Sequence, residues 1–176
     1  QNFPAIHYFW GNHDLWLQNL AHIAPNIKEA GLIEHNETRF FIHHGHIFDP
    51  SFGESSLLNT WLDKIIYSIS KTLRWDIRTT FHFLTERYYR NVAEIVAIKM
   101  KTQHLKLPFD VLISGHTHCP GKVQIDKFHV FNLGSWLQTP YAFFLKGDQY
   151  AFIKITADKL YPEEEDFNNI GGLRGL

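Results

Sequence analysis

Short apolar runs that end at turn residues predict strands before residue 43 and after residue 109. The expected strands are residues 5–10, 32–34, 39–42, 110–113, 122–125, 128–131, 141–145 and 150–155. The last four alternate as two hairpins, and the segments 32–34 and 39–42 flank a turn at Asn36.

Helical spacing is weaker near the N-terminus. Asp14 is placed to cap a helix that carries Leu15, Leu17, Leu20 and Ile23 and ends near Pro25. A second short helix is expected around residues 26–30, with Gly31 as its stop signal.

The middle of the chain changes to a helical period. From Ser55 to about Leu105, apolar residues recur at three- and four-residue steps. We interpret residues 53–106 as a helical cap inserted between two strands of a single domain over 1–160. The acidic and then glycine-rich segment 161–176 is expected to be a flexible tail.

Composition narrows the class of protein. A chain of 176 residues that is 44% hydrophobic can bury the core of one globular domain. The net charge of -1 argues against nucleic acid as a general partner. Cys119 is the single cysteine, so no internal disulfide can form and a reducing, cytoplasmic location is expected. No apolar run is long enough to span a bilayer, and no signal peptide is visible.

Charge is unevenly distributed. Residues 50–108 hold nine Lys/Arg against five Asp/Glu, a local balance of +4. Such a segment suggests an anionic partner, although a solvated helix face would have the same composition.

Three loops that leave predicted strands carry metal-competent side chains. They are Asn12-His13-Asp14, His44-Gly45-His46 and His116-Thr117-His118. Open α/β sheets place their sites at the carboxyl ends of strands, so we expect these loops to meet. Imidazole nitrogens with an amide oxygen suit a borderline divalent metal such as Mn²⁺, Fe²⁺, Zn²⁺ or Co²⁺.

The order Gly-Asn-His-Asp (11–14), His-Gly-His (44–46) and Gly-His-Thr-His (115–118) resembles the calcineurin-like metallophosphoesterase superfamily. The helical insertion and the segment 132–136 resemble, more loosely, its UDP-2,3-diacylglucosamine diphosphatase-like branch. The resemblance implies an α/β fold, namely a four-layer α/β/β/α sandwich, with the helical cap above the site.

The resemblance also implies roles for individual residues. Asn12, His44 and His116 would hold one metal and His118 a second, with Mn²⁺ expected first and Fe, Zn, Co or Ni as alternatives. His13 would contact the phosphate and act as the general acid, with Asp14 orienting its ring. Arg78 and Arg87 in the cap would bind the substrate.

The chain departs from the family pattern upstream of Gly11. The family supplies further ligands through Asp-x-His and Gly-Asp-x-x-Asp, and neither pattern occurs here. The chain is therefore expected to be either a fragment that lacks its N-terminal motifs or a diverged relative. His46 stands where the diphosphatase branch usually has aspartate, and His43 and His7 are assigned to sheet packing.

These observations predict a metal-dependent phosphoesterase that hydrolyses a phosphodiester or diphosphate bond. The leading substrate is a lipid-linked nucleotide such as UDP-diacylglucosamine, reached at the inner membrane face. The alternatives are a nucleotide or nucleic-acid phosphodiesterase and a non-catalytic scaffold of the same fold. No residue pattern predicts the oligomeric state.

Overall fold

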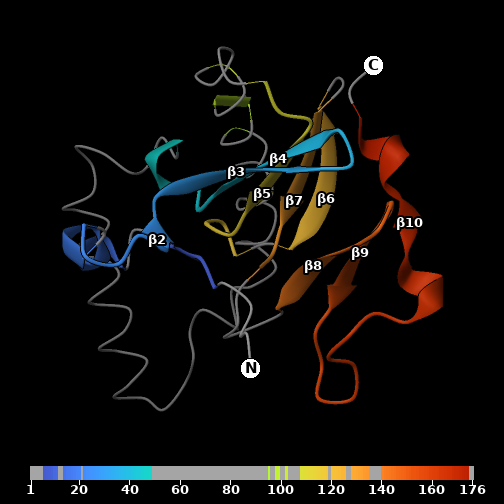
Figure 1. Cartoon of the computed structure of the whole chain (residues 1–176). Coiled ribbons are helices and arrows are strands. Elements are labelled where there is room, and N and C mark those ends of the chain that lie inside the picture. Colours follow the sequence, from blue (N-terminus) through green and yellow to red (C-terminus); the bar gives the residue numbers. More distant parts are fainter. Residues whose placement is uncertain are drawn as a thin grey trace.

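A computed structural model of the chain describes residues 6–11, 14–20, 22–48, 108–118, 120–125, 128–134 and 140–174, with the helical positions Ile95, Ile98, Lys99 and Thr102. Strands are the main regular structure of the described chain, with short 3-10 helices between them, in an arrangement consistent with an α/β fold (Figure 1). No helix in these described ranges is long and apolar enough to cross a membrane.

A mixed five-stranded sheet forms the centre of the molecule. Its strands lie in the order β3-β4-β5-β7-β6. They are β3 (Ala30–His35), β4 (Thr38–His43), β5 (Val111–Ser114), β6 (Gly121–Ile125) and β7 (Phe128–Asn132). The three inner strands β4, β5 and β7 are parallel, so the loops that follow them leave from one edge of the sheet.

A second sheet is antiparallel and has the order β10-β9-β8. It comprises β8 (Tyr141–Lys146), β9 (Gln149–Lys154) and β10 (Asn168–Asn169). A separate parallel pair joins β1 (Tyr8–Phe9) to β2 (Ile27–Lys28). The 3-10 helices are η1 (Leu15–Leu20), η2 (His46–Phe48), η3 (Glu164–Asp166) and η4 (Ile170–Leu173).

The central sheet is covered on both faces. Successive strand residues point to opposite faces, and β4 accordingly sends Phe40 to one core and Phe41 to another. The Phe40 core lies between the two sheets, where Phe131 of β7 meets Tyr150 of β9. The Phe41 core, with Leu112 and Phe48, covers the opposite face. Burial on both faces explains why β5 consists of four buried residues.

The expected hairpins are confirmed. The strands β3–β4, β6–β7 and β8–β9 pair in antiparallel register, with the β3–β4 turn at Asn36 and Glu37. The backbone φ is positive at Asn36, Glu37 and Gly147, and Gly147 lies in the β8–β9 turn. Turn residues therefore place the β3–β4 and β8–β9 hairpins where the sequence predicts them.

The helix expected around residues 26–30 is wrong. Residues 27–28 form β2 instead, and β3 begins at Ala30. The Tyr8 N–H donates to the Asn26 carbonyl at 2.8 Å and Tyr8 pairs with Ile27, so pairing with a distant segment overrides the local helix signal. The helix expected after Asp14 is the six-residue 3-10 helix η1.

The C-terminal segment packs against the rest of the molecule as far as Arg174, whereas its composition predicts a flexible tail over 161–176. The apolar side chains of Ile170 and Leu173 are each 1% exposed and join the core between the two sheets. β10 extends the second sheet, and the Ile170 N–H donates to the Asp148 carbonyl at 2.8 Å. Figure 1 shows this segment, in red, beside the β8–β9 hairpin.

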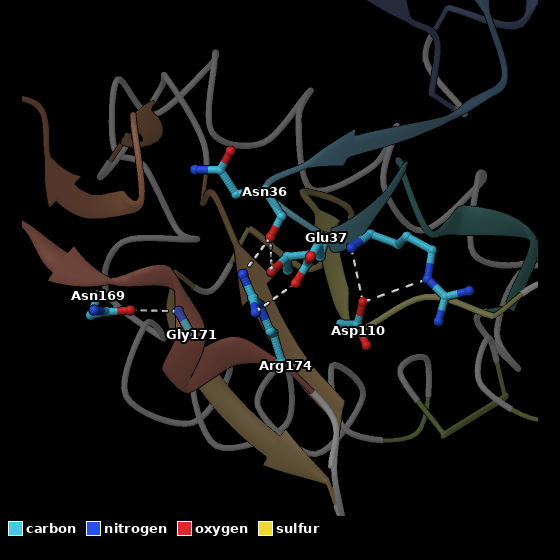
Figure 2. A network of polar contacts seen from close by, with 8 residues as sticks. Asn36, Glu37, Asp110, Asn169, Gly171 and Arg174 are labelled. Atoms are coloured by element: carbon cyan, nitrogen blue, oxygen red, sulfur yellow. Dashed lines mark hydrogen bonds and ion pairs between the residues drawn. The ribbon is translucent and has the colours of Figure 1, made fainter.

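A polar network fastens the end of this segment (Figure 2). Arg174 forms a 2.9 Å ion pair with Glu37 and donates to the Asn36 carbonyl at 2.8 Å. The Asn36 amide donates in turn to the Gly147 carbonyl at 2.6 Å. The two hairpin turns and the C-terminal segment are thereby linked.

The helical cap expected over 53–106 lies outside the described residues, except for four helical positions at its end. There the Thr102 hydroxyl donates to the Ile98 carbonyl at 2.9 Å, a contact typical of an α-helix.

Candidate functional site

The end of β4 separates His43 from His44. His43 is the last strand residue, is buried and stacks on Phe41, as expected for a packing residue. Its Nδ1 accepts the Gly45 N–H at 2.7 Å. His44 follows the strand, and the chain turns at Gly45, whose φ is 108°.

Backbone hydrogen bonds hold the loop after β5 against His44. The N–H groups of Gly115 and His116 both donate to the His44 carbonyl, at 3.3 and 3.0 Å. The imidazole rings of His44 and His116 then lie edge to face, with centroids 5.3 Å apart. The structure thus brings together two of the predicted metal ligands.

A buried hydrogen bond to Thr117 holds the third motif in place. The buried Asn132 at the end of β7 donates its amide to the Thr117 hydroxyl at 2.8 Å, and its carbonyl oxygen accepts the Gly134 N–H at 2.9 Å. His118 has a φ of 55° and an exposed side chain, and its N–H donates to the Gly115 carbonyl. The buried threonine thus fixes a tight turn with one histidine on each side.

Gly11 connects the first motif to the same place. A Cβ at this position would lie 2.7 Å from the His44 imidazole, so only glycine lets the backbone approach that ring. Gly11 is buried, and Asn12 and His13 follow it directly. Both of these predicted site residues lie outside the described residues.

Asp14 is held by a hydrogen bond from an earlier strand. The Tyr8 hydroxyl donates to its Oδ2 at 2.8 Å. This hydrogen bond, with burial and the carboxylate charge, raises the pKa of Tyr8. Asp14 immediately precedes η1, and the Leu17 N–H donates to its backbone carbonyl at 2.8 Å.

His46 belongs to the cluster, although the sequence pattern placed it in the second motif without a role in the site. Its side chain is 1% exposed, and its ring centroid lies 5.5 Å from that of His44 and 6.4 Å from that of His116. One feature of the sequence indicates this position: His46 directly follows Gly45, where a turn can bring the chain back towards the site.

Burial keeps the central imidazoles neutral. It lowers the pKa of His44 from 6.5 to about 3, with further lowering by the neighbouring His116, His46, His118 and His43. Burial and His116 lower the pKa of His46 to about 4. A neutral imidazole offers the lone pair that a metal requires, so both rings are in the ligand form at neutral pH.

The fit to a metal is partial within the described part of the chain. His44 and His116 supply two imidazole rings whose centroids lie 5.3 Å apart, and His118 stands two residues further along the same loop. Among the described residues, no group of three or more His, Cys, Asp or Glu side chains is arranged to hold a metal ion. Asn12, the third ligand expected for this metal, lies outside those residues. Arg78 and Arg87 lie outside them as well.

No protein-family model and no curated protein matches the chain. A similarity was found to a solved structure described as "Structural and Functional Characterization of a Novel Archaeal Phosphodiesterase", with 20% sequence identity and a TM-score of 0.34. The match covers 82% of this chain and 63% of that one. A likeness at this level establishes neither the family nor the activity of the chain.

Proposed function

We propose that the chain belongs to a metal-dependent phosphoesterase that hydrolyses a phosphodiester or diphosphate bond. The observation that carries the proposal is the meeting of His44 and His116, from the ends of two adjacent parallel strands, with ring centroids 5.3 Å apart. The contact of Gly11 with the His44 ring adds the segment that leads into Asn12-His13-Asp14. The four-layer sandwich and the helical cap are part of this proposal.

His44 and His116, with Asn12, would hold one divalent metal, and His118 would face a second. Bound metals of this kind polarise a phosphoryl oxygen and lower the pKa of a coordinated water. Mn²⁺ is the first candidate, with Fe, Zn, Co or Ni as alternatives.

The remaining roles fall to the first loop. His13 would donate a proton to the leaving oxygen, and Asp14 would orient the His13 ring. Asp14 is itself held by the Tyr8 hydroxyl at 2.8 Å, which supports a positioning role. A carboxylate that hydrogen-bonds an imidazole fixes its tautomer and raises its basicity.

A lipid-linked nucleotide such as UDP-diacylglucosamine is the proposed substrate, in a cytoplasmic protein at the inner membrane face. The support comes from the sequence, whose segment 50–108 carries the basic excess and includes Arg78 and Arg87. Arginine binds phosphate in a bidentate manner.

The first test is metal content combined with hydrolysis. Elemental analysis after incubation with Mn²⁺ should find one or two ions per chain, and bis(p-nitrophenyl) phosphate and UDP-diacylglucosamine should be assayed in parallel. His116→Ala should lose metal and any hydrolysis together. The matched control is His22→Ala, since His22 is an exposed histidine in a turn. A chain that binds no metal would favour the scaffold alternative and overturn the proposal.

A further inference from the structure

His46 lies where three segments of the site meet. Its ring centroid is 5.8 Å from that of Trp10, which immediately precedes Gly11. On its other sides it stacks with His43 at 5.9 Å and faces His44 at 5.5 Å and His116 at 6.4 Å. The rings around His46 therefore come from all three sequence motifs or from a residue next to one: His44 and His116 lie within motifs, and Trp10 directly precedes the first motif.

The turn after β4 brings His46 into this position. The Phe48 N–H donates to the Gly45 carbonyl at 3.2 Å and begins η2, which directs His46 and Phe48 inward. Ile47 between them is exposed. With 1% of its side chain exposed, His46 is enclosed by rings that limit its rotation.

Metal affinity depends on how well the ligand side chains are held. A site works when its ligands are locked in the productive geometry by packing and by neighbouring contacts. Within the described residues, His46 is packed against both imidazoles that would bind the same metal, and Trp10 supports it from another side.

We propose that His46 is a positioning residue whose ring, packed against Trp10 and His43, fixes the orientation of His44 and His116 towards a shared divalent cation. The inference rests on the proposed function, because it assumes that His44 and His116 bind a metal. As they lie, His44, His46 and His116 do not form a group that could hold a metal ion. His46 therefore acts through the other two rings and not as a ligand.

The test measures metal affinity in variants that distinguish the packing of the His46 ring from any role of its nitrogen atoms as ligands. Competition with a chelator gives the Kd for Zn²⁺ and Mn²⁺ in the purified chain, and the visible spectrum of the Co²⁺ form reports the coordination geometry. His46→Ala removes the ring and should weaken metal binding by about 10- to 100-fold, the range for residues that support metal ligands. His46→Phe keeps an aromatic ring and should restore most of the affinity and the Co²⁺ spectrum.

Reference variants separate this inference from the proposed function. His44→Ala removes a ligand and should weaken binding more than His46→Ala does, whereas His22→Ala should change nothing. Trp10→Leu removes the support of the His46 ring and should weaken binding in the same direction, which provides a second variant if His46→Phe does not fold. The melting temperature of each metal-free variant shows how much of any loss is general destabilisation.

Three results would overturn the inference. In the first, His46→Ala, or Trp10→Leu in its place, binds metal as the unaltered chain does. In the second, His46→Phe loses as much affinity as His44→Ala, which would make His46 a ligand. Either of these two results would leave the proposed function intact. In the third, the unaltered chain binds no metal, and the proposed function fails together with the inference.

Discussion

At the scale of single residues, the candidate site is shaped by close packing around two imidazoles. Gly11 touches the His44 ring, Thr117 is fixed by Asn132, and His46 fills the space beside both rings. None of these three is expected to touch a metal. Each limits the positions that His44 and His116 can adopt.

Gly11→Ala should destabilise the chain. The added Cβ would lie 2.7 Å from the His44 ring, so the ring or the backbone must move. Overpacking of this kind costs about 1–3 kcal/mol, which chemical denaturation would measure. The control is Gly115→Ala in the neighbouring loop, where a Cβ would meet no atom within 4 Å. Equal losses in the two variants would argue against the packing explanation.

Acid should destabilise the metal-free chain through His44 and His46. Their pKa values fall from 6.5 to about 3 and about 4 on folding, so the unfolded state binds more protons below pH 6.5. The free energy of unfolding should therefore be constant above about pH 7. It should decrease as the pH falls, by at most about 1.4 kcal/mol per pH unit for each group.

Urea denaturation at pH 7, 6 and 5 measures this dependence. His46→Phe removes one titrating group and should give a shallower decrease than the unaltered chain. An unaltered slope in His46→Phe would contradict the assignment.

At the scale of elements, the least expected feature is the C-terminal segment. Its acidic and glycine-rich composition suggests disorder, yet η4 places Ile170 and Leu173 in the core between the sheets. Spaced three residues apart, they point to one side of a single helical turn. The Asn169 side chain accepts the Gly171 N–H at 2.7 Å and caps that turn.

Leu173→Ala should therefore behave as a core substitution. Leu173 is 1% exposed, and truncation of a buried leucine costs about 2–5 kcal/mol. Leu160→Ala is the matched control, because Leu160 is 56% exposed and its loss should change stability by less than about 0.5 kcal/mol. Thermal or urea denaturation compares the two. Equal stability in both variants would mean that the segment is not docked in solution.

The sequence pattern correctly predicted those elements that depend on interactions between residues close together in the chain. The hairpins turned at Asn36 and Gly147 lie where they were expected, because the residues of a turn determine its backbone. The strand at residues 27–28 could not be predicted from its local sequence, since its partner is the distant strand β1 (Tyr8–Phe9). The motif histidines His44 and His116 were predicted to meet, but the packing of His46 depends on a turn that spacing alone does not reveal.

At the scale of the whole molecule, one exposed network joins parts that are distant in sequence. Arg174 contacts Asn36 and Glu37 in the β3–β4 turn (Figure 2). The side chains of His35 and Asn36 reach the Gly147 carbonyl in the β8–β9 turn, each at 2.6 Å. The network therefore connects the turns of the two sheets to the end of η4.

The ion pair in this network should contribute little, and the backbone contact more. Glu37→Ala should cost about 0–1 kcal/mol, because exposed ion pairs are screened by water and salt. Arg174→Ala also loses the hydrogen bond to the Asn36 carbonyl and should cost more. Urea denaturation at low and high salt separates the two: high salt should remove the Glu37 effect and leave part of the Arg174 effect. Identical, fully salt-sensitive losses would show that the hydrogen bond contributes nothing.

The parallel pairing of β4 with β5 has a kinetic consequence. The hairpins close over a few residues, whereas the Arg39 N–H and the Asp110 carboxylate that meet beside this pair are 71 residues apart in sequence. Contacts between such distant residues form late, since a long stretch of chain loses entropy before the contacts stabilise it. His44 and His116 stand at the far end of the same pair, so refolding should complete the hairpins first and the imidazole pair afterwards. Metal uptake, followed in time, would then record when the central sheet closes.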